Sequence, residues 1–465
     1  MVFLKIYNSL TKKLMGFRAK KDVNMYVCGP TVYNYAHIGN MRTYIFGDLI
    51  ARFLEYKGYK VKYVRNYTDV DDKTIKGSIE NGKSLEDFTN FYIREFEKDC
   101  STLNLNEPDV KPRPTRLIKE IVEFIEGLIK DGYAYKAKDG STYFDISKFV
   151  HYGKLNNIKQ KELKKGASER VNLDEYEKDN ASDFVLWKAW KEEDGKVYWN
   201  TSLGKGRPGW HIECSVMCHK YLGKTIDIHC GGEDLKFPHH ENEIAQSEAH
   251  NNARFVNYWI HFGMLTVDGK KMSKRYGNIY TIREILEKGY NPIALKLYYF
   301  MSNYRSAMDF SFEELKETEL KLNGFNKTIK RLVGYHGPKV DLGEYKKKIK
   351  GYLKDIEKAM DNDFNTRLAM TYLLDMFSYI NLNITEGNLS TGNIKFTLQM
   401  LKVLDVVFGI FKFPEAPATI IFDKVKKRQA YRAKKDYAMA DKMRDQLKDY
   451  MVEDHKNGAF SVYKN

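Results

Sequence analysis

The stretch "NMYVCGPTVYNYAHIGN" (residues 24–40) decides the fold, because a short strand ends within it and a helix begins within it. The strand stops at the Gly-Pro pair after Cys28, and an amphipathic helix then runs to Gly58 with apolar residues three or four positions apart. The segment "KVKYVRNYTDVDDK" (60–73) has the pattern of the next strand. A strand–helix–strand unit predicts an α/β fold with a Rossmann-like parallel sheet. Ligands of such sheets bind at the carboxyl ends of the strands, where Cys28 and Thr68 lie.

The composition indicates a globular protein of two to four domains. The chain has 465 residues, of which 43% are hydrophobic and 30% charged. Lysines interrupt the opening segment "MVFLKIYNSLTKKL", so it does not read as a signal peptide, and no apolar run could span a membrane. The five cysteines are odd in number and irregularly spaced, which favours a reducing compartment over a disulfide framework. We therefore expect a soluble, cytoplasmic protein.

The net charge of +15 and the pI of about 9.1 are compatible with two interpretations. The charge either serves solubility or attracts a polyanion such as nucleic acid. The basic residues crowd the end of the chain, where one helix is expected from Lys424 to Met451.

The pattern changes several times along the chain. A helix, a hairpin-like segment and a polar, loop-like stretch at 164–183 look inserted between two halves of the first domain. Four amphipathic helices after Glu313 predict a bundle. The expected divisions are a first catalytic half (1–111), an insertion (112–201), a second catalytic half (202–262), a linking region (263–312), the bundle (313–412) and a basic end (413–465).

A density of Cys, His and Glu in "GWHIECSVMCH" and "FPHHENEIAQSEAH" predicts a metal site. His239 and Glu243 are four residues apart, so they face the same way on a helix. With Cys28 and Cys214 they would complete a tetrahedral set that zinc accepts. The alternative is that these are ordinary helix-start and buried residues, and the absence of H-E-x-x-H spacing argues against a metallopeptidase.

Two further segments suggest phosphate binding. In "AHIGN", Gly39 lets a ligand approach the start of a helix, between His37 and Asn40. In "DGKKMSKRYGN", the cations of a glycine-bounded loop could neutralise a departing pyrophosphate, although such a charge run is more often simply solvated.

Together these residues resemble the class I aminoacyl-tRNA synthetases, and closely the cysteinyl-tRNA synthetases. The resemblance covers essentially the whole chain and depends on the order and spacing of its motifs. They are "CGPTVYNYAHIGN", "YVRNYTDVDDK", "FVLWK", "GRPGWHIECS", "DIHCGGEDLKFPHHENEIAQ", "NYWIHFGMLTVDGKKMSK" and "DNDFNT".

The resemblance implies roles for particular residues. The signature ending His-Ile-Gly-His matches 37–40, with Asn40 in place of the last histidine, and the Lys-Met-Ser-Lys-Ser signature matches 271–275, with Arg275 in place of the last serine. Both departures put the rate in doubt rather than the reaction class. The implied ATP-binding residues are Thr31, His37, Gly39, Asn40, Lys271 and Lys274, of which His37, Asn40, Lys271 and Lys274 are catalytic. The implied zinc ligands are Cys28, Cys214, His239 and Glu243. The implied cysteine-binding residues are Cys28, Gly29, Thr68, Trp210 and His239.

The expected reaction is activation of L-cysteine with ATP and Mg²⁺, followed by transfer to the 3′ end of a cysteine tRNA by a monomeric enzyme. Zinc would select the thiol, so no editing domain is needed, and the helical and basic C-terminal parts would bind tRNA. Three alternatives are a cysteine ligase that acts on an amino-sugar, a non-catalytic RNA-binding relative and a zinc hydrolase. We expect Cys100, Cys218 and Cys230 to be buried or incidental thiols, and Asp69, Asp71 and Asp72 only to decorate a helix start.

Overall fold

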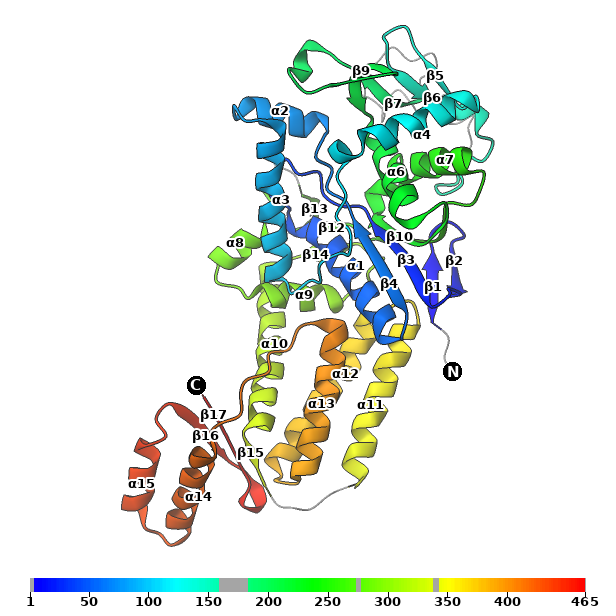
Figure 1. Ribbon diagram of the computed structural model, residues 1–465. Helices are drawn as coiled ribbons and strands as arrows, with labels where there is room; N and C mark the ends of the chain where they lie inside the picture. The colour runs from blue at the N-terminus through cyan, green and yellow to red at the C-terminus, as the bar shows by residue number, and fades with distance from the viewer. Residues whose placement is uncertain (1–3, 159–182, 273–276, 338–342, 465) are drawn as a thin grey trace. The chain divides into compact units, whose positions relative to one another are not determined.

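The computed structural model describes residues 4–158, 183–272, 277–337 and 343–464 (Figure 1). These residues form two compact units. The N-terminal unit comprises Phe3–Pro292 and Tyr304–Phe310, and the C-terminal unit comprises Ile293–Asn303 and Ser311–Asn465. The loop-like stretch expected at 164–183 lies almost wholly outside the described residues.

A four-stranded parallel sheet forms the centre of the N-terminal unit (Figure 1). Its order is β11 (Val256–Phe262), β10 (Ile226–Gly232), β3 (Asp22–Val27) and β4 (Lys60–Arg65). Helix α1 (Ile38–Tyr56) makes the crossover from β3 to β4, and its apolar residues are buried. The predicted α/β fold with a Rossmann-like parallel sheet is confirmed.

Helices and short strands flank this sheet. Helices α2 (Asp72–Glu80) and α3 (Leu85–Thr102) follow β4, and the side chain of Ser84 caps α3. The unit also contains α8 (Ile282–Glu287) and two small sheets: β1 (Lys5–Asn8) with β2 (Lys13–Gly16), and β12 (Leu265–Val267) with β13 (Lys270–Lys271) and β14 (Met308–Phe310).

The inserted region is a helix and an antiparallel sheet. Helix α4 (Ile118–Lys130) precedes five strands in the order β5-β6-β7-β9-β8. The strands are β5 (Ala134–Lys136), β6 (Thr142–Phe144), β7 (Phe184–Ala189), β8 (Trp199–Thr201) and β9 (Gly204–Pro208). Strand β9 leads into α6 (Trp210–Leu222), and α7 (His239–Asn251) joins β10 to β11. One cluster of buried apolar side chains extends from the parallel sheet into this region, so both share a core.

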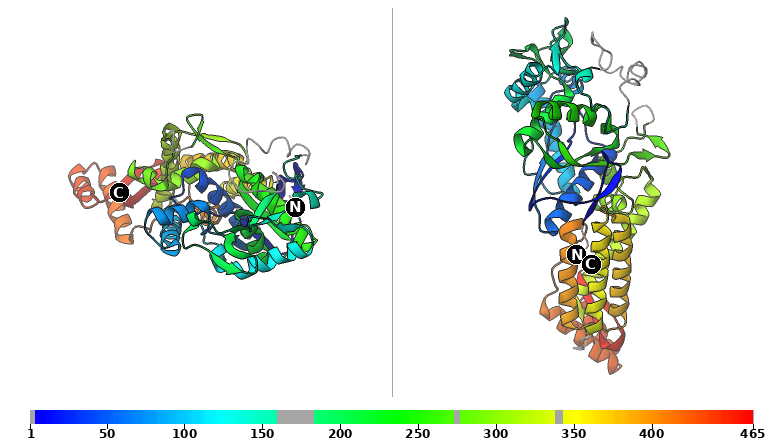
Figure 2. Two further views of the ribbon diagram at one scale, coloured as in Figure 1. Left: turned by 90° about the horizontal axis from the view of Figure 1, so that it is seen from above. Right: turned by 90° about the vertical axis from the view of Figure 1, so that its right-hand side faces the viewer.

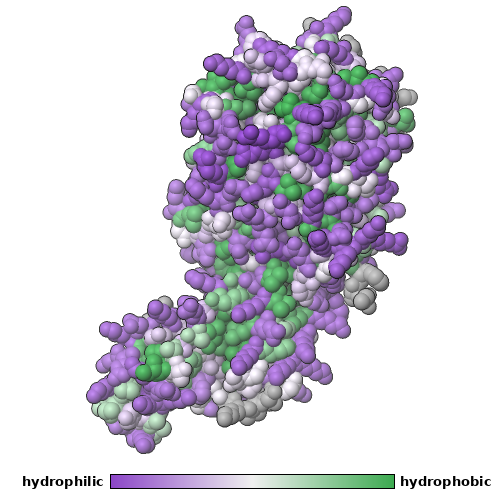
Figure 3. Space-filling model, in the orientation of Figure 1, coloured by the Kyte–Doolittle hydropathy of each residue, from purple (hydrophilic) through white to green (hydrophobic). Residues whose placement is uncertain are grey.

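The C-terminal unit contains the predicted helical bundle, whose helices run side by side in both Figure 1 and Figure 2. The helices are α10 (Phe312–Val333), α11 (Gly343–Asp361), α12 (Thr366–Thr385) and α13 (Thr391–Phe408), preceded by α9 (Pro292–Phe300). Phe325 and Phe377 pack in its core with ring centroids 4.4 Å apart. In the space-filling view, green apolar residues gather over this bundle (Figure 3). Within the described residues, no helix combines the length and the apolar character that crossing a bilayer requires.

The prediction of one long helix from Lys424 to Met451 is wrong. The segment forms α14 (Thr419–Ala433), α15 (Tyr437–Asp445) and β16 (Tyr450–Asp454), and β16 pairs with β17 (Phe460–Lys464) in a sheet that also holds β15 (Tyr335–His336). Lys435 has a left-handed backbone (φ 60°), which ends the first helix. The carboxylate of Asp436 then accepts a hydrogen bond from the Met439 N–H and starts the second helix.

Candidate active site and metal centre

The four predicted metal ligands meet at the carboxyl edge of the parallel sheet. Cys28 follows β3, Cys214 lies in the second turn of α6, and His239 and Glu243 lie one turn apart at the start of α7. One ligand atom from each lies within 4.8 Å of all the others, and all four residues are buried. His239 Nε2 is 3.0 Å from Glu243 Oε1, and Cys28 Sγ is 3.7 Å from the same oxygen. Two sulfurs, an imidazole and a carboxylate form a donor set that suits zinc.

Electrostatics inside the cluster favour ionised ligands. Burial raises the pKa of Glu243, but His229 and His239 outweigh it and hold that pKa at about 2. A hydrogen bond from Cys28 lowers the pKa of Cys214 to about 6 against the effect of burial. Burial raises the pKa of Cys28 itself. One thiolate and one carboxylate therefore form readily, and these are the forms that bind a metal.

Two histidines that the sequence reasoning did not assign also contact the cluster. His229 in β10 lies 2.8 Å from Glu243 Oε2 through its Nε2, and His240 Nε2 lies 3.4 Å from Cys28 Sγ. With Cys28 and Glu243 they form a second set whose ligand atoms also lie within 4.8 Å of one another. The available signal was the position of His229 in "DIHCGGEDLKFPHHENEIAQ", one of the motifs on which the resemblance depends.

The predicted amino-acid-binding residues lie next to the metal cluster. The Trp210 ring stacks on His239 with centroids 4.4 Å apart, and Trp210 remains 37% exposed. Thr68 is buried and pairs with Thr31 in an isolated parallel bridge. Asn66, which the sequence did not single out, joins these segments: its Oδ1 accepts from the Gly29 N–H at 2.7 Å, and its Nδ2 donates to Thr68 Oγ1 at 3.1 Å. A Cβ at Gly29 would collide with the Asn66 carbonyl, so only glycine fits there.

His37 and Asn40 form a capping box at the start of α1. The Asn40 N–H donates to His37 Nδ1 at 3.1 Å, and Asn40 Oδ1 accepts from the His37 N–H at 3.3 Å. Burial lowers the pKa of His37, which favours the neutral ring, and the hydrogen bond that Nδ1 accepts assigns the ring proton to Nε2. His37 can therefore donate from Nε2, whereas the Asn40 amide oxygen is occupied by the cap.

The two signatures lie together in space. A Cβ at Gly39 would collide with Met272 Cε, His37 pairs with Thr281, and the Ile38 N–H donates to the Tyr280 carbonyl at 2.8 Å. Lys271 is the last residue of β13, and Lys274 lies outside the described residues. The start of α1 thus contacts both segments that flank the lysine loop.

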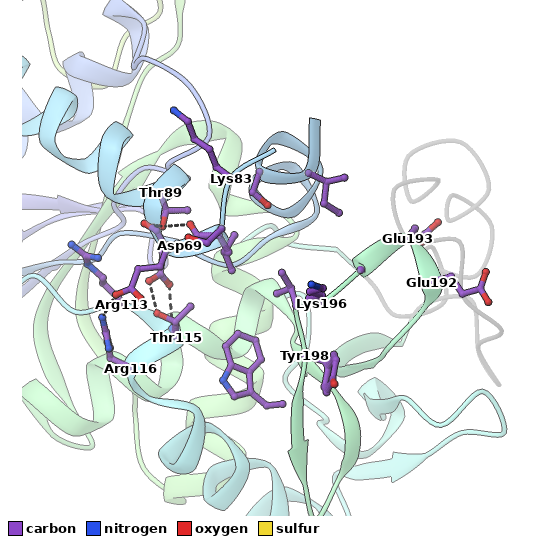
Figure 4. A pocket seen from close by; sticks show the side chains of 18 residues that line it. Asp69, Lys83, Thr89, Arg113, Thr115, Arg116, Glu192, Glu193, Lys196 and Tyr198 are labelled. Carbon is purple, nitrogen blue, oxygen red and sulfur yellow. Dashed lines mark hydrogen bonds and ion pairs between the residues drawn. The ribbon is translucent and has the colours of Figure 1, made fainter. Parts of the chain in front are cut away.

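The acidic residues after Thr68 have separate contacts. Asp71 caps α2, as expected of a residue at a helix start. Asp69 instead accepts from Thr115 N–H and Oγ1 at 3.1 and 2.5 Å, and Asp72 pairs with Lys188 Nζ at 2.9 Å and with Arg207. The expectation that all three only decorate a helix start is wrong, because Asp69 also contacts Thr115 (Figure 4) and Asp72 also joins α2 to the inserted sheet. The three remaining cysteines are buried free thiols, as predicted.

The fold and this sheet edge define a class I aminoacyl-tRNA synthetase. Residues 15–320 match the family model described as the class I (C) tRNA synthetase catalytic domain, and residues 355–412 match the DALR domain. A methionyl-tRNA synthetase from Mycobacterium tuberculosis, solved with methionyl-adenylate, shares the fold with a TM-score of 0.61 at 14% identity, over 83% of this chain and 90% of that one.

Two relatives of known family show to which group of class I synthetases the chain belongs. The chain is 45% identical to a cysteine–tRNA ligase of Brachyspira hyodysenteriae over 95% of both chains. It is 41% identical to a cysteine–tRNA ligase of Chlamydia felis over 98% of this chain and 97% of the relative. The chain therefore belongs to the cysteine–tRNA ligase family.

Proposed function

We propose that this chain activates L-cysteine with ATP and transfers it to the 3′ end of a cysteine tRNA. The observation that carries the proposal is the buried set of Cys28, Cys214, His239 and Glu243, and the capped start of α1, which can bind phosphate, supports it. A zinc hydrolase would explain the buried set but not the start of α1. A module that only binds RNA needs no such buried set.

In the first step, the cysteine carboxylate attacks the α-phosphorus of ATP, and pyrophosphate leaves with the electron pair of the broken P–O bond. The carboxylate is already ionised at neutral pH, so catalysis consists of positioning and charge stabilisation. His37 donates from Nε2 to the phosphates, and the α1 N-terminus adds a positive dipole end. We assign the remaining ATP contacts to Thr31, Gly39 and Asn40, and the departing pyrophosphate to Lys271 and Lys274, with Mg²⁺ bound to the nucleotide.

In the second step, a ribose hydroxyl at the tRNA 3′ end, the 2′-hydroxyl by class, attacks the acyl carbon. AMP leaves, and the hydroxyl proton passes to the departing phosphate or to water. Thr68 and Trp210 hold the amino acid between the sheet edge and α6, while Gly29 admits its backbone. The acyl carbon is thereby held at the sheet edge for both steps.

Selection of sulfur over oxygen is the task of the buried set. A hydrophobic pocket separates cysteine from serine by only about 1–3 kcal/mol. A zinc ion held by Cys28, Cys214, His239 and Glu243 supplies a soft cation that prefers a thiolate to an alkoxide. Cysteine-dependent ATP–pyrophosphate exchange tests the proposal, with serine at cellular concentration as the competitor. Appreciable exchange with serine would contradict it.

We further propose that the bundle and the basic end of the chain bind tRNA, while adenylate formation stays in the N-terminal unit. Arg428 and Arg432 pair with Asp454, which leaves Lys424, Lys426 and Lys427 of α14 as candidate phosphate contacts. Removing residues after Lys412 should spare pyrophosphate exchange and abolish aminoacylation. Acceptance of cysteine by an amino-sugar instead of tRNA would favour the alternative ligase. The five buried free thiols support a reducing compartment such as the cytoplasm, and we propose that the enzyme acts there as a monomer.

A further inference from the structure

A buried arginine of helix α1 joins this helix to the hairpin that β12 and β13 form (residues 265–271; Figure 1). Arg42 lies in the second turn of α1, five residues after His37, and is only 1% exposed. Its Nη1 donates to the Gly263 carbonyl at 2.6 Å and to the Met264 carbonyl at 3.2 Å. Its Nη2 donates to the Ser306 carbonyl at 2.8 Å. One guanidinium therefore holds the backbone of two separate segments.

These two segments lead into neighbouring strands. Gly263 and Met264 connect β11 to β12, and Ser306 comes shortly before β14, which pairs in parallel with β12. The Met308 N–H of β14 donates in turn to the Met264 carbonyl at 3.0 Å. Because Arg42 holds the chain just before both strands, it sets where the β12–β13 hairpin lies relative to α1.

The chemistry of this junction requires arginine at position 42. A buried guanidinium is tolerated when it is hydrogen-bonded, and bonds from a charged donor are stronger than those between neutral groups. The planar fork points its two terminal nitrogens at different carbonyls, whereas the single nitrogen of lysine cannot bridge both segments in this way. A Cβ at Gly263 would collide with the Ser306 carbonyl, so the segments approach this closely only because residue 263 is glycine.

A second attachment joins α1 to the chain beyond the lysine loop. The Ile38 N–H donates to the Tyr280 carbonyl at 2.8 Å, and His37 and Thr281 form an isolated bridge. This attachment uses backbone atoms and survives a change of side chain. The attachment before the loop, in contrast, depends on the side chain of Arg42, so a single substitution can release the hairpin on that side.

We propose that Arg42 is a positioning residue for adenylate formation. Its guanidinium holds the β12–β13 hairpin, which ends at Lys271, in the place from which the lysine stabilises the departing pyrophosphate while His37 binds the phosphates. The proposal rests on the proposed function, because both of these roles are assigned there. Arg42 acts through the hairpin, and it belongs to neither set of metal-ligating side chains, so metal and cysteine binding should not depend on it.

The first test is Arg42→Lys, which keeps the buried charge and removes the fork. A displacement of about 1 Å can cost about 100-fold in rate, so we expect kcat to fall by about 10–100-fold. The ratio kcat/KM for ATP should fall by the same factor as kcat, since the lost interaction is made only in the transition state. The KM for cysteine and the bound metal should not change. Pyrophosphate exchange at varied ATP and cysteine, with metal analysis, measures these quantities.

Arg52→Lys is the matched control, because Arg52 is a second buried arginine of α1 and is 8% exposed. Its Nε pairs with Asp48 at 2.7 Å, and its Nη2 donates to the Asn104 carbonyl at 2.8 Å, just after α3. The control should lower the melting temperature and leave kcat unchanged. If a folded Arg42→Lys variant keeps the wild-type kcat, or if both variants lower kcat equally, the proposal is overturned.

A double-mutant cycle tests whether Arg42 acts through the hairpin lysine. Arg42→Lys is introduced into wild type and into a Lys271→Ala variant, and kcat is compared within each pair. Once the positioned side chain is gone, Arg42→Lys should cost less than about threefold, because residues that act as one unit are not additive. An equal cost in both backgrounds would overturn the proposal.

Gly263→Ala covers the case in which Arg42→Lys does not fold, as judged by thermal melting. The added methyl group should push the Ser306 segment away and lower kcat while the metal stays bound. Gly16→Ala is its control, because a Cβ there would meet no atom within 4 Å. A folded Gly263→Ala variant with the wild-type kcat would overturn the proposal.

The wild-type enzyme separates the two possible failures. Wild-type protein without cysteine-dependent exchange contradicts the proposed function. Normal exchange in the wild type, together with an unchanged kcat in folded Arg42→Lys, contradicts only the role of Arg42.

Discussion

The sheet edge has two ends that are built in different ways: the proposed metal-binding end and the proposed phosphate-binding end. At the metal end, Cys28, Cys214, His239 and Glu243 are at most 5% exposed, and each side chain contacts another ionisable group. At the phosphate end, His37 and Asn40 are partly exposed and use one hydrogen-bond acceptor each to cap a helix. Metal binding by a buried set of donors depends on every donor atom. A helix start, in contrast, can still bind an anion through its backbone N–H groups after a side chain has been replaced. We therefore expect the proposed phosphate-binding end to tolerate a substitution, such as Asn40 for the histidine that the resemblance implies, better than the proposed metal-binding end.

Replacing a metal ligand should have the largest effect. Cys214→Ser removes the more acidic of the two thiols, and we expect bound zinc and cysteine activation to fall by more than about 100-fold, since even outer contacts of a metal site are worth 10–100-fold. Metal analysis of the purified variant and pyrophosphate exchange measure the two losses. Cys218→Ser, one turn further along α6 and outside the ligand set, is the matched control. Full metal content in the Cys214→Ser variant would refute the assignment.

His229→Gln should have the next largest effect, because it breaks the 2.8 Å contact that orients Glu243. We expect zinc affinity to fall by about 10–100-fold, with the ligands themselves unchanged. A competition titration with a chelator measures the affinity without depending on activity. If the zinc affinity stays at the wild-type value, the buried set does not depend on the contact between His229 and Glu243.

Asn40→Asp separates the two proposed roles of Asn40, which are capping helix α1 and binding the ATP phosphates. Aspartate keeps an oxygen that can accept from the His37 N–H, but it places a negative charge beside the ATP phosphates. We expect the KM for ATP to rise by about tenfold, which is roughly 1.4 kcal/mol of repulsion, while the melting temperature stays the same. Asn40→Ala should instead lower stability by about 1 kcal/mol, because the cap is lost. A lower melting temperature for Asn40→Asp than for Asn40→Ala would contradict this division.

Asp72→Asn should weaken the junction between helix α2 and the inserted sheet. Lys188 and Arg207 are buried, but the Asp72 side chain is 56% exposed, so the expected loss is about 1 kcal/mol of stability. Urea denaturation at low and high salt measures it. Glu80→Gln on the same helix is the control, because its ion pair with Lys76 is exposed on both sides. If Glu80→Gln lowers the stability as much as Asp72→Asn does, the ion pairs of Asp72 stabilise the protein no more than an exposed pair.

The smallest effect concerns pH. Burial lowers the pKa of His37, and the cap needs the neutral ring, so activity should be retained as the pH falls through the ordinary histidine value near 6.5. The acid limb of pyrophosphate exchange should therefore lie below pH 6.5. A limb above that pH would show that His37 is not held neutral.

The sequence predicted the sheet and the ligands whose spacing carries information. His239 and Glu243 follow from helical periodicity, and Cys28 follows from its place at a strand end. The contacts of Asn66 and Asp72 could not be found in this way, because each acts through a partner that only the folded chain brings near. The break between α14 and α15 was missed because lysine, unlike glycine or asparagine, gives no signal for a left-handed residue.

The metal ligands come from segments that lie far apart in the chain, from Cys28 to Glu243, with the insertion between them. During synthesis, the set is incomplete until α7 has left the ribosome, although β3 and α1 emerge early. A metal held by all four residues would therefore link the early strand β3 to two helices, α6 and α7, that are made only after the insertion.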